Sequence, residues 1–256
     1  MFVSTRSLAL FVMVCITPLA KPAFAYRPFI TEDAGVAGLK TLQTEVSFDS
    51  YQWKNGDVDQ TFLLVAPIYG PTENIELSTE LPYVTHIVAN GSTTKGVGDI
   101  NLVAKYVVAW ERFETKDALF TIKGYVKLNS GSYAQGLGRG DTEYVLSPVF
   151  TKIVNTSVTV HAQYAYSWVV GKQDPDLRNF RLWGLAADYR ITEPFHLIVE
   201  FTSNQNPERG QVDQKLSQLG FTYAVNKDLI FDTTYKKGIG LTSPTRGFGV
   251  GVSIQF

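Results

Sequence analysis

The last ten residues, Gly247–Phe256, alternate strictly between two kinds of side chain. They read GFGVGVSIQF, so an aromatic or aliphatic residue stands at every second position and Gly, Ser or Gln fills the gaps. Period-two alternation indicates a β-strand whose two faces meet different surroundings. One face here is apolar and the other is small or polar, which fits a strand placed between lipid and an aqueous lumen. The final aromatic fits the same setting, because membrane barrels carry aromatic residues at the bilayer interface.

Strand-like runs of similar length recur along the chain from residue 41 onward. Each is close to the roughly 9–11 residues that a tilted strand needs to cross a bilayer. The chain therefore predicts an all-β fold, a transmembrane antiparallel up-and-down β-barrel of about 12 strands over residues 41–256. The predicted strands are Thr41–Trp53, Val58–Tyr69, Ile75–Ile87, Asp99–Trp110, Ala118–Leu128, Asp141–Thr151, Ser157–Trp168, Asn179–Arg190, Phe195–Ser203, Val212–Val225, Leu229–Lys237 and Gly247–Phe256.

The connections between these runs alternate in kind. Tight turns such as Gly70–Asn74 and Val225–Asp228 alternate with longer stretches rich in Gly, Ser, Asn and charge, such as Val88–Gly98 and Asn129–Gly140. Only Lys54–Asp57 is a short member of the second set. Outer-membrane barrels have short periplasmic turns and long extracellular loops. With an even number of strands, this pattern predicts that both termini are periplasmic.

Residues 1–25 have the features of a cleavable export signal. The apolar run Leu8–Thr17 follows a basic residue and is too short to span a bilayer as a helix. Small residues at the ends of Ala23–Ala25 suit cleavage, so we predict that the mature chain begins at Tyr26. A periplasmic N-terminal segment, residues 26–40, then precedes the barrel. An uncleaved N-terminal membrane anchor is the alternative.

Composition excludes several kinds of site. The only cysteine, Cys15, lies in the predicted signal, so the mature chain is expected to have no disulfide, catalytic thiol or Cys-ligated metal. The 23 basic and 24 acidic residues nearly balance, which gives no reason to expect a nucleic-acid partner. After the signal, no apolar run approaches the ~18–20 residues of a transmembrane helix.

Charged residues within the predicted strands indicate which face is the lumen. A Lys or Arg that faces lipid near the midplane costs roughly 2–4 kcal/mol, and Asp or Glu somewhat less. In Ile75–Tyr83, the phase that turns Glu76 and Glu80 inward is therefore favoured. The same argument predicts a lumen lined by Glu45, Glu76, Glu80, Lys105, Lys123, Lys127, His161, Glu200, Asp232 and Lys236.

Some residues conflict with a regular barrel. Phe62–Tyr69 is apolar on both phases. In the run Asn179–Arg190, the phase that turns Asp188 inward turns Arg181 outward, which predicts that Arg181 lies near the rim or beside a bulge. Proline removes a ladder hydrogen bond, so bulges or irregular strand ends are expected at Pro67, Pro82 and Pro148.

A soluble sandwich or a lipocalin-like barrel is the alternative fold for alternating strands, but in those folds the apolar face points inward. Aromatic residues at the predicted strand ends, such as Tyr69, Trp168 and Phe195, instead fit the interfacial girdles of a membrane barrel. The terminal strand also resembles the C-terminal signal of bacterial outer-membrane proteins, which the barrel-assembly machinery reads. The residues that carry this predicted assembly signal are Phe248, Val250, Val252, Ile254 and Phe256.

The chain after the signal resembles a family of outer-membrane proteins labelled for the MetA pathway of phenol degradation. The resemblance is carried by Arg27–Ala34, Pro67–Tyr83, Gly96–Tyr106 and Gly138–Lys152, together with the terminal strand. It implies a barrel in the cell outer membrane, of a kind often encoded beside catabolic genes for aromatic or other small molecules. It implies no substrate and no phenol-degrading chemistry.

A barrel of this size predicts a function in transport. Barrels of about 8 strands are filled by side chains and those of about 16 leave an open channel, so about 12 strands predict a narrow pore. Acidic and basic residues on neighbouring walls then orient small solutes, aromatic ones among them. The expected partners are outer-membrane lipid, the barrel-assembly machinery and a small-molecule solute, with no cofactor. The alternative is a structural or surface-interaction barrel whose lumen is plugged by its own charges.

An outer-membrane lipid hydrolase is the less favoured alternative. Such an enzyme needs a Ser and a His close together at the lipid boundary. His161 and Ser167 share the predicted lumen face, but they stand about 20 Å apart along one strand. His86 lies near the outer rim without an evident partner, and three dispersed histidines make a poor zinc site. We therefore predict that the protein is not an enzyme and binds no metal.

Overall fold

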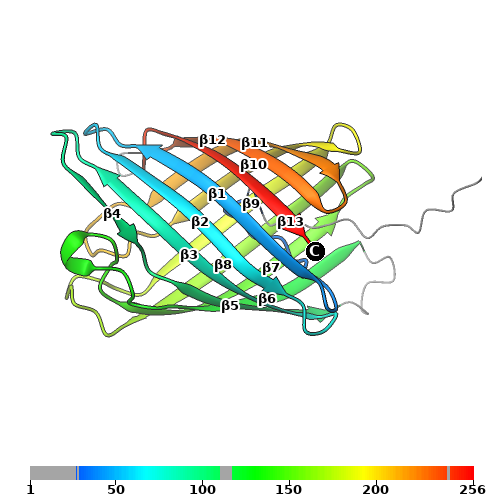
Figure 1. The fold of residues 1–256 in the computed structure, drawn as a ribbon, viewed down its shortest axis with the longest axis horizontal. Coiled ribbons are helices and arrows are strands. Elements are labelled where there is room, and N and C mark those ends of the chain that lie inside the picture. Colours follow the sequence, from blue (N-terminus) through cyan, green and yellow to red (C-terminus); the bar gives the residue numbers. More distant parts are fainter. Residues whose placement is uncertain (1–26, 28, 110–116, 241–242) are drawn as a thin grey trace, which may run out of the picture.

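The computed structural model describes residue 27 and residues 29–109, 117–240 and 243–256. These form a barrel of tilted antiparallel strands (Figure 1). The predicted export signal lies outside the described residues, among which no helix is long and apolar enough to span a membrane. The elements are β1 (Leu42–Gln52), β2 (Val58–Tyr69), β3 (Ile75–Ile87), β4 (Thr93–Val97), β5 (Asn101–Ala109), β6 (Ala118–Lys127), the 3-10 turn η1 (Tyr133–Gln135), β7 (Thr142–Ile153), β8 (Val158–Val170), β9 (Phe180–Arg190), β10 (Phe195–Asn204), β11 (Gln214–Asn226), β12 (Leu229–Gly238) and β13 (Arg246–Gln255).

The barrel closes between its first and last strands. β1 pairs antiparallel with β13, and the other wall strands pair with their neighbours in the sequence. β4 and β5 share one position in the wall, because β4 pairs with Tyr83–Ile87 and β5 with Ile75–Glu80 of the same strand, β3. The wall therefore has 12 positions, as predicted. The prediction that Val88–Gly98 is a loop was wrong in one respect. This stretch contains β4, which pairs with the last part of β3 to form a two-stranded ribbon.

Side chains alternate between an exposed outer face and a buried inner face. In β3, Leu77 is 47% exposed and its neighbour Glu76 is 2% exposed. In β13, Phe248 is 50% and Val250 39% exposed, and the intervening glycines face inward against β1 and β12. Val252 and Ile254 continue the outer row, and Phe256 follows the strand with 74% exposure. An outer face this apolar suits lipid, whereas the inner face keeps charge away from it.

The three prolines behave differently. At Pro67 the pairing of β2 with β3 shifts register between Val65 and Ile68, which is the irregularity expected there. At Pro148 the ladder between β7 and β8 is interrupted, and its register resumes unchanged. At Pro82 the pairing with β2 is regular, but on the other side of β3 the ladder breaks between Glu80, which pairs with Asn101 of β5, and Tyr83, which pairs with Val97 of β4, so the expected irregularity lies on that side.

Residues 29–37 lie inside the barrel. The sequence predicts a periplasmic segment ahead of the first strand, but Thr31 and Ala34 are fully buried and contact the inner wall. The chain then returns to the wall, where Lys40 donates its backbone N–H to the Gly70 carbonyl oxygen at 2.7 Å. We call residues 29–37 the plug segment.

Candidate functional site

The ten side chains predicted to line the lumen all lie on the inner face of the wall. Glu80 and Lys127 are half-buried. The other eight are buried, namely Glu45, Glu76, Lys105, Lys123, His161, Glu200, Asp232 and Lys236. Side chains facing a wide aqueous pore would be exposed, so these residues lie in a lumen that is largely filled.

Hydrogen bonds to backbone N–H groups hold the plug segment. Glu200 accepts from two consecutive N–H groups, those of Ile30 and Thr31. The side chains that accept hydrogen bonds from the segment stand, in chain order of the donors, on β10, β8, β7 and β3. The segment therefore crosses the lumen from one side of the wall to the other. The pairs with ordinary distances are Ile30 with Glu200 (3.0 Å), Glu32 with Gln163 (2.9 Å), Ala34 with Thr151 (2.9 Å) and Ala37 with Glu76 (2.8 Å).

A buried charge cluster lies at the middle of the plug segment. Lys105 and Lys123 stand directly opposite each other on β5 and β6, where two like charges repel. Glu32 bridges them, with an ion pair to Lys123 and a 3.5 Å ion pair to Lys105. Lys105 also donates from Nζ to the backbone oxygen of Asp33 at 3.0 Å. The plug segment thus supplies a carboxylate that both wall lysines share, and Glu80 of β3 adds a second ion pair to Lys123 at 3.6 Å.

The pKa values of the two acidic residues of the plug segment are shifted in opposite directions. Burial alone raises the pKa of Glu32, but Lys123 and Lys105 together outweigh it and hold that pKa below its ordinary value of 4.5. Burial raises the pKa of Asp33, and the nearby Lys105 offsets this only in part. The ionised form of Glu32 therefore favours the seated plug, whereas the ionised form of Asp33 opposes it.

Acid is expected to loosen the plug. A depressed pKa means that the stabilisation by Glu32 is present above pH 4.5 and is lost as the pH falls through its lower value in the folded protein. Asp33 protonates first and tightens the seat slightly, so we expect channel current to rise only after the pH has fallen below 4.5. Single-channel recording from about pH 7 to pH 3 checks this. In Glu32→Gln the low-pH rise should vanish, and a rise that persists in this variant would contradict the assignment.

Arg27 ties the chain ahead of the plug segment to the opposite wall. Its guanidinium lies 3.4 Å from Asp232 on β12 and 3.5 Å from Asp49 on β1. Asp49 also pairs with Lys236, so the charges at this point alternate in sign. A side chain on Gly251 would crowd Asp232 and lie 2.5 Å from Arg27 Nε. The small residues in the inward row of β13 therefore make room for this ion network.

The wall also fits the plug segment sterically. A Cβ atom on Gly184 of β9 would lie 3.2 Å from the Thr31 Cβ and closer still to its hydroxyl oxygen. A Cβ atom on Gly70 would run into the backbone of Gly38. Phe29 packs against the His161 ring with 4.9 Å between ring centroids. These contacts show a seat shaped for residues 29–38.

A second ion cluster lies towards the long-loop end of the lumen. Lys127 contacts Asp99, Asp141 and Glu143, at 2.9, 3.2 and 3.4 Å. Arg139 pairs with the last two and lies over the Phe180 ring, with 5.0 Å between the guanidinium carbon and the ring centroid. The loop between β6 and β7 is thereby fastened to the wall and brings a cation to the lumen.

The sequence pattern did not reveal two of the residues whose ion pairs hold the plug segment and the chain just ahead of it. Arg27 and Glu32 lie in a stretch without period, and its one informative feature is that RPFITEDA carries the family resemblance. Glu143 and Arg139 were also missed. Glu143 follows the same alternation as the predicted lumen residues and was therefore accessible to the charge argument, whereas Arg139 belongs to a loop and gave no such signal.

The histidines pair with wall residues. His161 shares a hydrogen bond of 2.9 Å with Thr151, His196 contacts Asp188 at 2.8 Å, and His86 contacts Asp59. The described part of the chain contains no group of three or more His, Cys, Asp or Glu residues arranged to hold a metal ion.

Comparison with known proteins identifies the family. Residues 25–256 match the model of the family described as "Putative MetA-pathway of phenol degradation". The chain belongs to this family. No curated protein sequence matches it.

Solved structures with the same fold are outer-membrane barrels. The COG4313 outer membrane channel from Pseudomonas putida F1 aligns with a TM-score of 0.71 and 14% identity, over 88% of this chain and 98% of that one. The KdgM porin aligns with a TM-score of 0.53 and 14% identity, over 83% and 99% of the two chains. The NanC porin gives 0.54 and 13%, over 83% and 98%. At these identities the likeness shows the fold.

Proposed function

We propose that this protein is an outer-membrane channel through which small solutes diffuse when the plug segment leaves its seat. The observation that carries the proposal is the kind of contact that holds the segment. Its contacts are largely hydrogen bonds to backbone N–H groups and ion pairs, as at Glu200 and Glu32. Water can replace each of these, so a typical hydrogen bond contributes only about 1 kcal/mol net. A segment held in this way can detach while the barrel stays folded.

The lining indicates the class of solute. Acidic and basic side chains face each other across a narrow space, so a solute that carries both polar and apolar parts is oriented as it passes. Phe29 and His161 add aromatic surface at the level of the plug segment. Small polar or aromatic solutes are therefore the proposed cargo, and no enzymatic step is part of the proposal.

The proposed setting is the outer membrane of a Gram-negative cell, reached through the export signal at residues 1–25. The family and the barrels of like fold support this setting. The short turns and both termini face the periplasm, so the plug segment enters from the periplasmic side. The apolar row of β13 is then the signal for the barrel-assembly machinery.

A second candidate is a structural or surface-interaction barrel that never opens. The observation that favours it is that the plug segment is anchored at several points, Glu32 among them, and that Arg27 anchors the chain just ahead of it. If every anchor must break at once, the lumen stays closed.

Conductance of the refolded protein in a planar bilayer separates the two candidates. A channel should give brief current steps, and Glu80→Gln should shift its selectivity towards anions because one inward carboxylate is lost. Glu73→Gln, an exposed turn residue, is the control and should leave selectivity unchanged. A barrel that inserts stably and stays silent would exclude the channel and favour the second candidate.

A further inference from the structure

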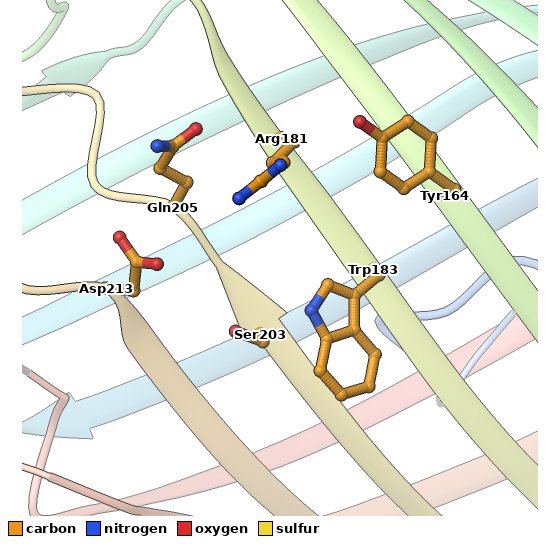
Figure 2. A pocket seen from close by; sticks show the side chains of 6 residues that line it. All are labelled: Tyr164, Arg181, Trp183, Ser203, Gln205 and Asp213. Carbon is orange, nitrogen blue, oxygen red and sulfur yellow. The ribbon is translucent and has the colours of Figure 1, made fainter.

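Four adjacent strands present polar and aromatic side chains on the outer face, at the middle of β8 and near the long-loop ends of β9, β10 and β11. Trp183 of β9 is the register partner of Tyr164 on β8 and of Ser203 on β10, and Ser203 is the partner of Lys215 on β11. One row further towards the loops stand Arg181, Gln205 and Asp213. Six of these side chains, all but that of Lys215, line a hollow of about 300 Å³, and Figure 2 shows how they lie. We call this hollow the outer notch.

Arg181 is out of place on an outward face unless it has an anionic partner. It is the second residue of β9 and its side chain is exposed, which confirms its predicted place near the rim. Within the described ranges no ion pair involves Arg181. An outward arginine costs ~2–4 kcal/mol at the midplane and ~0–1 near the interface. A guanidinium at headgroup depth is suited to a phosphate, which it can bind through two parallel hydrogen bonds.

The rest of the outer notch suits a sugar. Trp183 and Tyr164 are 40% and 43% exposed, so both offer apolar ring surface as well as an N–H or O–H group. Ser203 is only 7% exposed and forms the floor, with Gln205 and Asp213 at the side. These groups match sugar hydroxyls. Asp213, which also accepts the backbone N–H of Asn206 at 3.3 Å, repels any phosphate, and a plain anionic phospholipid brings no sugar hydroxyl that would offset this repulsion.

We infer that the outer notch binds the phosphorylated sugar headgroup of an outer-leaflet glycolipid. Arg181, with Lys215 one row away, takes the phosphate. The aromatic pair and the polar floor take the sugar ring, and the acyl chains continue along the apolar surface of β8–β11. The inference rests on the proposed orientation of the barrel, because only then does the notch lie in the outer leaflet.

Native mass spectrometry of the detergent-solubilised barrel tests the site. The probe is bisphosphorylated lipid A, compared with dephosphorylated lipid A and with phosphatidylglycerol. We expect wild-type protein to retain the bisphosphorylated form, and Arg181→Gln to bind it about tenfold more weakly, since a charge-assisted hydrogen bond is lost. Trp183→Leu should also weaken it by severalfold. Heat-modifiable migration on gels confirms that each variant is folded.

Lys152→Gln is the matched control, because Lys152 faces outward at the short-turn end of β7 and is far from the notch. It should bind lipid A like the wild type. Equal binding by wild type and Arg181→Gln would overturn the inference, as would equal retention of phosphatidylglycerol. The measurement needs no solute flux, so a barrel that binds lipid A yet conducts nothing would refute the channel and leave the notch standing.

Discussion

Glu32→Lys is expected to open the channel. In the seated state this change places a third cation against Lys105 and Lys123, whose side chains are 2% and 9% exposed. Removing one partner of a buried ion pair costs roughly 3–5 kcal/mol, even before the new repulsion is added. The ratio of seated to released plug should therefore fall more than a hundredfold. The barrel wall itself keeps all of its strands and pairings.

Planar-bilayer recording measures directly how long the channel stays open. Glu32→Lys should show long open periods at neutral pH, whereas the wild type shows brief ones. Glu73→Lys makes the same charge change in an exposed turn and should behave like the wild type. If Glu32→Lys stays as closed as Glu73→Lys, the charge cluster does not hold the plug segment.

Gly184→Val should release the plug segment from the wall side. The new side chain occupies the space of Thr31, whose Cβ lies 3.2 Å from the position of a Cβ at residue 184. Overpacking of a well-filled space typically costs ~1–3 kcal/mol, and release of the plug segment relieves it. Valine suits a β-strand, so the barrel should assemble normally. We expect open probability to rise roughly tenfold or more.

Two further variants isolate the steric cause. Gly124→Val adds the same side chain on the outward face of β6, where the nearest atom is 3.7 Å from the new Cβ, and should leave current unchanged. Thr31→Gly combined with Gly184→Val removes the clashing atoms and should close the channel again. Independent effects of the two changes, with no such rescue, would mean that the contact between Thr31 and residue 184 is not what seats the plug.

The barrel was predictable because the alternation of side chains within each strand determines which face meets lipid. Strict alternation around Leu77 and Glu76 leaves one phase whose charge avoids lipid, and the structure buries Glu76 on the inner face. The position of Arg181 near the rim followed from the same argument applied to Asp188. Each conclusion needed only neighbours in one strand, and period two supplies those.

The plug was not predictable because it depends on contacts between distant parts of the chain. Residues 29–37 have no period, and their acceptors on β10, β8, β7 and β3 follow them by many residues in the sequence. Much of the holding is done by backbone N–H groups, which every non-proline residue has, so side-chain identity gave little signal. The lysine pair on β5 and β6 was the one available hint. Two like charges placed opposite each other inside a barrel need an anion nearby, and Glu32 meets both lysines while Glu80 meets only Lys123.

β4 and Arg139 were not predictable for a second reason, namely that each depends on pairing with another segment. Thr93–Val97 lacks an apolar face, so the alternation that identifies wall strands is absent, and only its pairing with β3 makes it a strand. Arg139 reaches the lumen because the loop carrying it is fastened by Asp99, which accepts its backbone N–H at 3.1 Å. Neither arrangement follows from a pattern within the segment itself.

A reversible covalent lock on the plug segment tests whether solutes pass only when that segment leaves its seat. The only cysteine, Cys15, lies in the predicted signal, so Thr31→Cys with Gly184→Cys places a single cysteine pair in the mature chain. The Cβ separation of 3.2 Å is close to the ~3.5–4.5 Å of a disulfide, so a small shift suffices. Solute flux into liposomes is measured with the pair oxidised and then reduced. We expect no flux through the oxidised barrel and recovery of flux on reduction, whereas wild-type flux should not change with reductant. Equal flux in both states would show that solutes pass without displacement of the plug segment, which would contradict the proposed function.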